Sequence, residues 1–133
     1  SDLVMGHLGL TPQSVHALGG FKVQGRGEDA DAIIKDAKAL ESAGVFALVL
    51  EAIPAELAGE ITKQISIPTI GIGAGVDCDA QVLVWTDLMG LTSKMPKLAK
   101  AYRNLRKEIS DAAAEFAQDV ATGRFPTQDQ SFH

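Results

Sequence analysis

The sequence predicts an α/β fold in which strands and helices alternate and the strands pair into a parallel sheet. Short apolar runs of strand length alternate with segments whose apolar residues recur at helical spacing. One run, "VFALVLE" at residues 45–51, is apolar almost throughout, as expected for a strand that is covered on both faces. We therefore expect four βα units whose strands run in one direction.

Four segments are predicted as strands, each of them short and apolar. In chain order they are "LVMGHLGL" at residues 3–10, "VFALVLE" at 45–51, "IPTIGIGAG" at 67–75, and a strand around Leu83–Asp87 within "QVLVWTDLMGL".

Three segments are predicted as helices. The first carries an apolar stripe from Ala30 to Leu40 and is closed by Gly44. The second begins with Pro54, a residue favoured in the first turn of a helix. The third and longest is expected from about 96 to 122, with an apolar face that includes Tyr102, and is followed by a polar tail at 123–133.

Two segments do not fit a plain βα unit. An excursion at residues 11–29 is much longer than the usual connection between a strand and a helix, and long loops inside compact domains are usually functional. The segment "GIGAGVDCD" at 71–79 has glycines that permit close backbone approach and anion binding. A dinucleotide-binding motif is excluded because its third glycine position is occupied by Val76.

Composition excludes several classes of protein. The chain has 133 residues, is 46% hydrophobic and 22% charged, and carries a formal charge of -5, which argues against a nucleic-acid binder. The single cysteine, Cys78, excludes an internal disulfide and every zinc site built from several cysteines. With no apolar run of membrane-spanning length, we expect no membrane association and a cytoplasmic location.

Several motifs, in order along the chain, resemble the ketopantoate hydroxymethyltransferase family. They are "GHLGLTPQSV" at 6–15, "GFKVQGRG" at 20–27, "LEAIPAELA" at 50–58, "IPTIGIGAG" at 67–75 and the terminal "SFH". The resemblance implies a (β/α)8 TIM barrel, of which residues 1–133 would supply the C-terminal half, about four βα units. Such barrels need about 250 residues.

The resemblance also implies an activity. Family members transfer a hydroxymethyl group from 5,10-methylenetetrahydrofolate to 3-methyl-2-oxobutanoate, giving 2-dehydropantoate in the first committed step of pantothenate biosynthesis. Mg2+ is the implied cofactor, and the resemblance places its acidic ligands and a substrate-binding lysine upstream of Ser1. We therefore expect no metal ligands in this chain. The family also implies a homo-oligomer, a decamer built as a dimer of pentamers.

Glu51 is the strongest candidate for a catalytic residue. It is the last residue of a predicted strand, and ligands of parallel sheets and barrels meet the carboxyl ends of the strands. The resemblance implies that this glutamate is the proton acceptor. The alternative interpretation is that Glu51 only caps the helix that follows.

His7 is a second candidate, near the end of the first strand, where an imidazole could contact the bound oxoacid; the alternative is a core histidine. Asp77 and Asp79 flank Cys78 at a spacing compatible with metal ligands, although helix capping is the favoured interpretation. Other residues carry weaker hypotheses: Lys22 and Arg26 as anion contacts or solvated charges, His16 on the surface or at an interface, His133 at the end of the tail, and Trp85 and Tyr102 in packing.

Two other classes of function remain open on the sequence. A half barrel without its metal-binding half could be an inactive fragment or an assembly module, since it leaves open strand edges and an uncovered apolar face. A sugar-phosphate isomerase would explain the glycines of "GIGAG", but not the other motifs.

Overall fold

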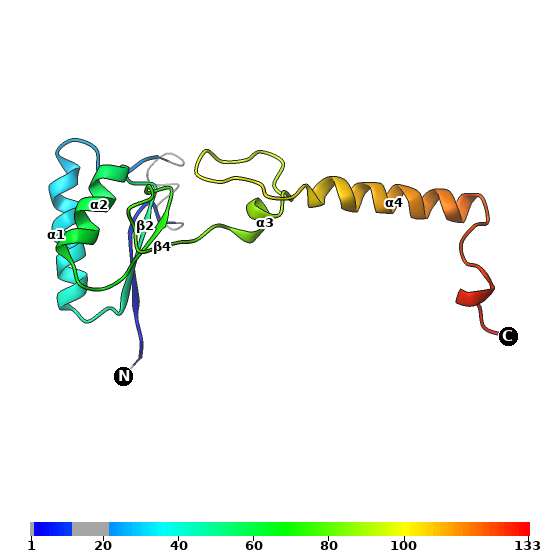
Figure 1. Cartoon of the computed structure of the whole chain (residues 1–133), viewed down its shortest axis with the longest axis horizontal. Coiled ribbons are helices and arrows are strands. Elements are labelled where there is room, and N and C mark those ends of the chain that lie inside the picture. The colour runs from blue at the N-terminus through cyan, green and yellow to red at the C-terminus, as the bar shows by residue number, and fades with distance from the viewer. Residues whose placement is uncertain (1, 12–21) are drawn as a thin grey trace. The chain divides into compact units, whose positions relative to one another are not determined.

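The computed structural model describes residues 2–11 and 22–133, which form two compact units, residues 1–83 and 84–133. The first unit holds a four-stranded sheet in the order β1 (Met5–Gly9), β2 (Ala47–Glu51), β3 (Thr69–Ile72) and β4 (Ala80–Gln81). All neighbouring strands are parallel. The predicted α/β class and parallel sheet are therefore confirmed (Figure 1).

The position of the fourth strand was predicted wrongly. The strand expected around Leu83–Asp87 is the two-residue β4 at Ala80–Gln81, and residues 85–88 form the short helix α3 (Trp85–Leu88). The sheet ends where the Val82 amide donates to the carbonyl of Gly71. The third βα unit also lacks a helix, because residues 73–79 connect β3 to β4 without one.

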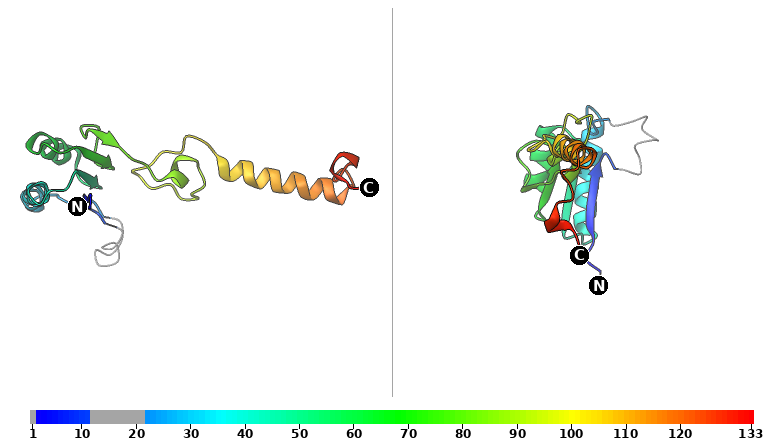
Figure 2. Two further views of the ribbon diagram at one scale, coloured as in Figure 1. Left: turned by 90° about the horizontal axis from the view of Figure 1, so that it is seen from below. Right: turned by 90° about the vertical axis from the view of Figure 1, so that its right-hand side faces the viewer.

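Two helices cover one face of the sheet. The helices α1 (Asp29–Ser42) and α2 (Ala55–Gln64) follow β1 and β2, as predicted, and Figures 1 and 2 show both on the same side of the strands. Leu48 and Leu50 of β2 and Ile61 of α2 are completely buried between sheet and helices. The core of this unit therefore lies between the sheet and its two helices.

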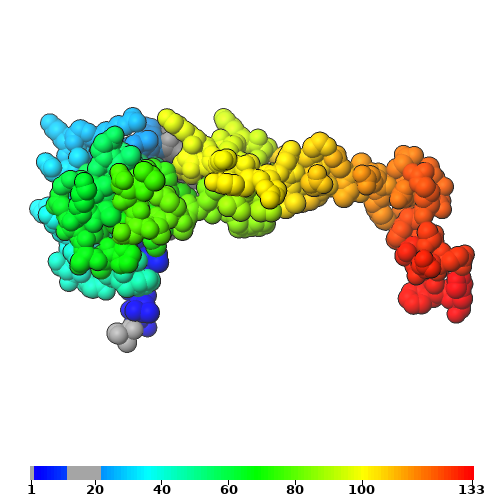
Figure 3. Space-filling model, viewed as in Figure 1, coloured from blue at the N-terminus to red at the C-terminus, as the bar shows by residue number. Residues whose placement is uncertain are grey.

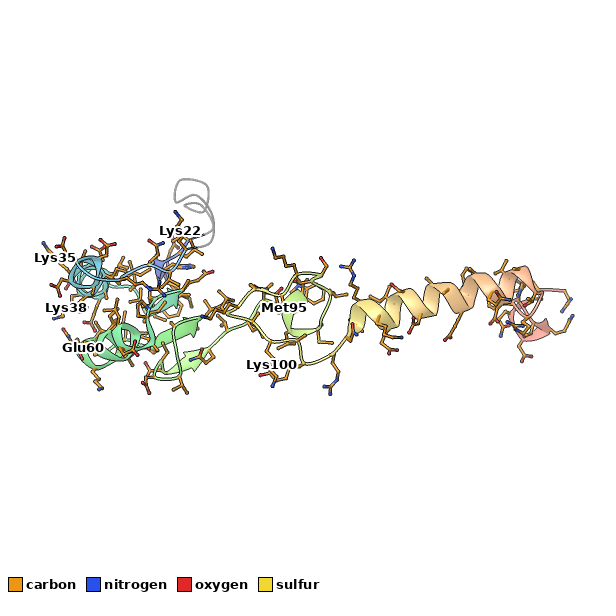
Figure 4. The ribbon with its side chains drawn as sticks, turned by 90° about the horizontal axis from the view of Figure 1, so that it is seen from above. Lys22, Lys35, Lys38, Glu60, Met95 and Lys100 are labelled. Atoms are coloured by element: carbon orange, nitrogen blue, oxygen red, sulfur yellow. The ribbon has the colours of Figure 1, made fainter. Side chains whose placement is uncertain are left out.

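The outer surface of α1 and α2 is polar. In the space-filling view the two helices form one continuous surface (Figure 3). Lys35 and Lys38 of α1 and Glu60 of α2 are exposed and project away from the strands (Figure 4). Each helix therefore has a buried apolar face and a solvated face, as the helical spacing predicted.

The opposite face of the sheet carries a different set of side chains. Because successive residues of a strand point to opposite faces, the residues that alternate with the buried leucines face away from α1 and α2. We call this the open face; its side chains are Met5, His7, Ala47, Val49, Glu51, Ile70 and Ile72. Met5 is 45% exposed, and neither α1 nor α2 covers this face.

The glycines of "GIGAG" have a packing role. A Cβ added to Gly75, which has a positive φ of 81°, would lie 2.4 Å from the Cβ of Ala55 at the start of α2. A Cβ on Gly71 would lie 3.0 Å from the sulfur of Cys78. These glycines permit the connection from β3 to β4 to pack against α2 and the sheet.

The second unit holds α3, the helix α4 (Leu105–Ala121) and a 3-10 turn, η2 (Gln128–Gln130). The helix predicted at about 96–122 begins later than expected, because the backbone amides of Tyr102, Leu105 and Arg106 donate to Leu88, Met89 and Gly90. The side chain of Asn104 then caps α4 by accepting from the Lys107 amide. Residues 96–104 are therefore not helical.

The expectation that Trp85 and Tyr102 are packing residues was wrong. Trp85 is 63% exposed and Tyr102 is 55% exposed, with the ammonium of Lys100 4.8 Å from the centre of the tyrosine ring. The apolar face of α4 is exposed as well, including Phe116 at 56%. Helical spacing identified this face, and Phe125 packs against Phe116 edge-on, at 5.5 Å between ring centres, but leaves it more than half exposed.

One carboxylate joins α1 to the start of β3. Glu41 accepts hydrogen bonds from the Ser66 hydroxyl, the Ser66 amide and the Ile67 amide, at 2.6, 2.6 and 3.3 Å. The hydrogen bond from the Ser66 side chain, followed by those from the two amides, lowers the pKa of Glu41 below its ordinary value of 4.5. The ionised form is therefore favoured by folding.

We expect Glu41→Gln to lower the free energy of unfolding near neutral pH. Because the pKa of Glu41 is lowered in the folded protein, its contribution is present above about pH 4.5 and is lost as the pH falls through the folded pKa. Urea unfolding at about pH 7 should give a lower free energy of unfolding for Glu41→Gln than for the unchanged protein, and this difference should shrink at about pH 3. Glu56→Gln, at an exposed position of α2, is the control; a difference independent of pH would contradict the prediction.

Candidate active site

His7 and Glu51 meet on the open face, at the carboxyl edge of the sheet. His7 of β1 is paired with Val49 of β2, and Glu51 lies two residues further along β2. The two side chains are therefore diagonal neighbours on one face of adjacent strands. Glu51 is the last residue of its strand, as predicted, and its side chain is 19% exposed, against 34% for His7.

A hydrogen bond joins the two side chains. The Nε2 atom of His7 lies 3.0 Å from the Oε2 atom of Glu51 and 3.1 Å from the carbonyl oxygen of Leu10. A carbonyl oxygen can only accept, so this geometry assigns a hydrogen to Nε2. His7 therefore donates to the Glu51 carboxylate, and no described residue hydrogen-bonds to Oε1.

Gly9 is required beside this pair. It lies directly opposite Glu51 in the register of β1 and β2 and has a positive φ of 89°. A Cβ at Gly9 would lie 2.1 Å from the carbonyl oxygen of Glu51 and 2.8 Å from Ile53. The missing side chain permits the Leu10 amide to donate to that same Glu51 oxygen at 3.0 Å.

The residue after Glu51 has an unusual backbone. Ala52 has a φ of 51°, in the left-handed region that costs an alanine about 1–2 kcal/mol. Its amide donates to Ile72 at 2.9 Å, and its carbonyl accepts from the Gln24 amide at 2.8 Å. Neither Gly9 nor Ala52 was recognised as a site residue from the sequence, and no local signal marks an alanine for a positive φ.

Glu51 does not cap the following helix. The N-cap of α2 is Pro54, and no side chain hydrogen-bonds to the first turn of that helix. The carboxylate is instead bound across the sheet by His7. A carboxylate that is partly exposed and held in direction by a neighbouring side chain is suited to accepting a proton from a bound molecule.

Asp77 and Asp79 do not cap a helix, because no helix follows them. Asp79 accepts from the Thr69 amide at 2.8 Å and from the Thr69 hydroxyl at 3.2 Å, and it lies at the amino end of β3, away from Glu51. The Thr69 hydroxyl also contacts that of Thr62 at 2.8 Å. Asp79 therefore joins the loop before β4 to the start of β3.

Cys78 lies beside this network. Burial raises the pKa of its thiol above the ordinary value of 9.0, and hydrogen bonds with Thr69 and Thr62 only partly offset this. The thiol is therefore mostly protonated at neutral pH.

The structure joins none of the other described candidates to His7 or Glu51 by a hydrogen bond. Lys22, Arg26 and His133 are exposed, and His16 falls outside the described part of the chain. Within residues 2–11 and 22–133, no three side chains of the His, Cys, Asp or Glu type are grouped so as to hold a metal ion. In the same ranges no helix has the length and apolar character needed to cross a bilayer.

Comparison with known proteins identifies the family. The sequence model of ketopantoate hydroxymethyltransferase matches residues 3–128, nearly the whole chain. The chain belongs to this family. The match confirms the resemblance found in the motifs and is at odds with the sugar-phosphate isomerase alternative.

Curated relatives show how much of a family member the chain represents. A protein of Acidothermus cellulolyticus named 3-methyl-2-oxobutanoate hydroxymethyltransferase is 62% identical over 130 residues, which are 97% of this chain and 48% of that protein. Proteins of the same name are 56% identical in Thermobifida fusca and 54% identical in Pelobacter propionicus, where 46% and 49% of their lengths are covered. The chain spans about half the length of these relatives.

We expect Asp79→Ala to destabilise the first unit by about 1–3 kcal/mol, because the buried Thr69 amide loses its charged acceptor. Asp77→Ala removes the same charge from the same loop and should change the free energy of unfolding by less than about 0.5 kcal/mol. Denaturant unfolding of both variants measures the difference. Equal effects would show that Asp79 has no special structural role.

Proposed function

We propose that this chain contributes the proton acceptor to hydroxymethyl transfer from 5,10-methylenetetrahydrofolate to 3-methyl-2-oxobutanoate, giving 2-dehydropantoate for pantothenate biosynthesis. The printed name of the relatives supports the reaction. The observation that supports the residue is the Glu51 carboxylate, which lies on the open face at the carboxyl edge of the sheet and is bound by His7.

The reaction needs a base at one defined position. The C3 atom of the oxoacid is adjacent to its carbonyl group, and removal of the C3 proton gives an enolate that forms a bond to the one-carbon unit. That carbon leaves both folate nitrogens, and water supplies the hydroxyl group and a second proton. The two protons end on the two folate nitrogens, so that the step is balanced. We assign the removal of the C3 proton to Oε1 of Glu51, the oxygen that His7 does not bind.

His7 is proposed to orient Glu51. Its Nε2–H donates to Oε2, which fixes the direction of the carboxylate toward the open face. A lone core histidine would not require an acidic partner, so the diagonal placement of the two residues favours the active-site interpretation. The side chain of His7 is 34% exposed, which permits contact with a bound oxoacid.

Mg2+, as implied by the family, would polarise the oxoacid carbonyl and stabilise the enolate when bound. The described residues do not fit a Mg2+ site, because a hard cation needs several convergent oxygen ligands and no such group is present among them. We therefore derive no step through the ion and propose that its ligands belong to a part of the enzyme outside this chain.

The chain is further proposed to form the C-terminal half of a single (β/α)8 barrel, and the four parallel strands and the half-length match to relatives support this. The open face would then be the barrel interior. We also propose a cytoplasmic homo-oligomer, a decamer as the family implies, in which exposed apolar residues such as Phe116 find partners.

A second candidate function is an inactive assembly module. Two observations favour it: the chain spans about half of its relatives, and the described residues include no metal-binding group. A module of this kind would retain the His7–Glu51 pair without turning over substrate.

The catalytic proposal is tested in a chimera in which this chain replaces the matching 130 residues of the Acidothermus cellulolyticus relative. We expect Glu51→Gln to lower kcat by about a hundred-fold or more, since the amide cannot accept a proton but has nearly the same volume. Formation of 2-dehydropantoate and thermal unfolding are measured together.

Glu56→Gln is the matched control, because it makes the same exchange at an exposed position of α2, five residues away. Its kcat should stay close to that of the parent chimera. Undiminished turnover in the Glu51→Gln chimera would remove Glu51 from the mechanism, and an inactive parent chimera would favour the assembly module.

The assembly proposal concerns the chain by itself. Because Met5 on the open face and Phe116 on α4 are both about half exposed, we expect residues 1–133 alone to dimerise, to aggregate, or to need the remaining part of a family member for solubility. Size-exclusion chromatography with light scattering gives the mass. A monodisperse species of 14.0 kDa with a cooperative unfolding transition would contradict the half-barrel proposal.

A further inference from the structure

We propose that Ala52 is a positioning residue for the reaction, because its left-handed backbone conformation holds the Glu51 carboxylate in the direction of His7. The inference rests on the proposed role of Glu51 as the proton acceptor. It concerns a residue that has no reactive group of its own and that, although it lies within the motif at residues 50–58, was given no role there.

The peptide group between Glu51 and Ala52 is held on both sides. Its carbonyl, from Glu51, accepts from the Leu10 amide at 3.0 Å, and its amide, from Ala52, donates to the Ile72 carbonyl at 2.9 Å. These hydrogen bonds continue the ladders of β1 and β3 one residue beyond the end of β2. The plane of this peptide, and with it the backbone from which the Glu51 side chain projects, is therefore fixed by both neighbouring strands.

The chain must leave the sheet immediately after this peptide. The helix α2 is capped by Pro54 and begins at Ala55. Ile53, which lies between Ala52 and Pro54, is in the core and only 2% exposed. With a φ of 51°, Ala52 turns the chain toward α2 without disturbing the peptide before it. An extended residue at position 52 would instead carry the chain onward past the sheet edge, or break the hydrogen bond to Ile72.

A third hydrogen bond holds the other side of Ala52. Its carbonyl accepts from the Gln24 amide at 2.8 Å, and the neighbouring Gly25 is buried against Ile33 and Leu57 of the two helices. Ala52 itself is only 8% exposed. Both peptides that flank Ala52 are thus fixed, so that another φ at this residue must displace one of them. Displacement of the peptide before Ala52 moves Glu51 with it.

The test compares residues of similar size that differ in their tolerance of a positive φ. Asn adopts the left-handed region far more readily than Thr, whose branched Cβ disfavours it, and the two side chains have similar volumes. In the chimera we expect Ala52→Thr to lower kcat by about ten-fold or more, since small displacements of a catalytic group reduce the rate strongly. The KM for the oxoacid should change by less than about two-fold.

Ala52→Asn and Ala52→Gly are the rescue variants, and each should turn over at least about ten-fold faster than Ala52→Thr. Thermal unfolding is measured on every variant, and kcat is expressed per folded enzyme. If Ala52→Thr is recovered only as aggregate, Ala52→Ser against Ala52→Gly makes the same comparison, with the serine variant expected to be slower.

Two outcomes would overturn the inference. Equal kcat in the Thr and Asn variants, whether both high or both low, would show that the backbone conformation at position 52 does not position the base. A change in KM without a change in kcat would assign Ala52 to substrate binding instead. The Glu51→Gln variant tests the proposed function separately. If its turnover is undiminished, Glu51 is not the base, whatever the variants at position 52 show.

Discussion

The parallel pairing of β1 with β2 in a single register is the constraint on which the site depends. This register sets Gly9 opposite Glu51 and brings His7 within hydrogen-bond distance of the carboxylate. A shift of one residue would turn Glu51 toward the helices and into the apolar core. The leucines of β2 that pack under α1 and α2 prevent this shift, so that core packing and the geometry of the site are determined together.

The two faces of the sheet have different roles, one in stability and the other in the candidate active site. The helix-covered face holds the apolar core, whereas the open face carries the polar pair at its carboxyl edge. Parallel sheets bind ligands at this edge because the loops that follow the strands meet there. The polar network at the opposite edge is built from hydrogen bonds among Thr62, Thr69 and Asp79, and a structural role accounts for it.

The second unit shows where local patterns are insufficient. The apolar spacing that predicted a helix from about 96 continues without interruption through residue 104, and Pro96 is a favourable helix start. The amides of Tyr102 and Leu105 are nevertheless bound by carbonyls at the end of α3 and just after it, and these bonds replace the helical ones. The side chain of Asn104 then caps α4 by accepting from the Lys107 amide.

By itself the sequence determined the α/β class, the first three strands, the first two helices, the family, and Glu51 as the candidate base. These features depend on local apolar patterns and on motifs, which can be read from neighbouring residues. Only the tertiary structure decided that His7 binds Glu51, that Asp79 is bound by Thr69, and that Ala52 has a left-handed backbone. Each of these depends on strands or segments far apart in the chain, because register, hydrogen-bond partners and backbone strain arise only when the elements pack together.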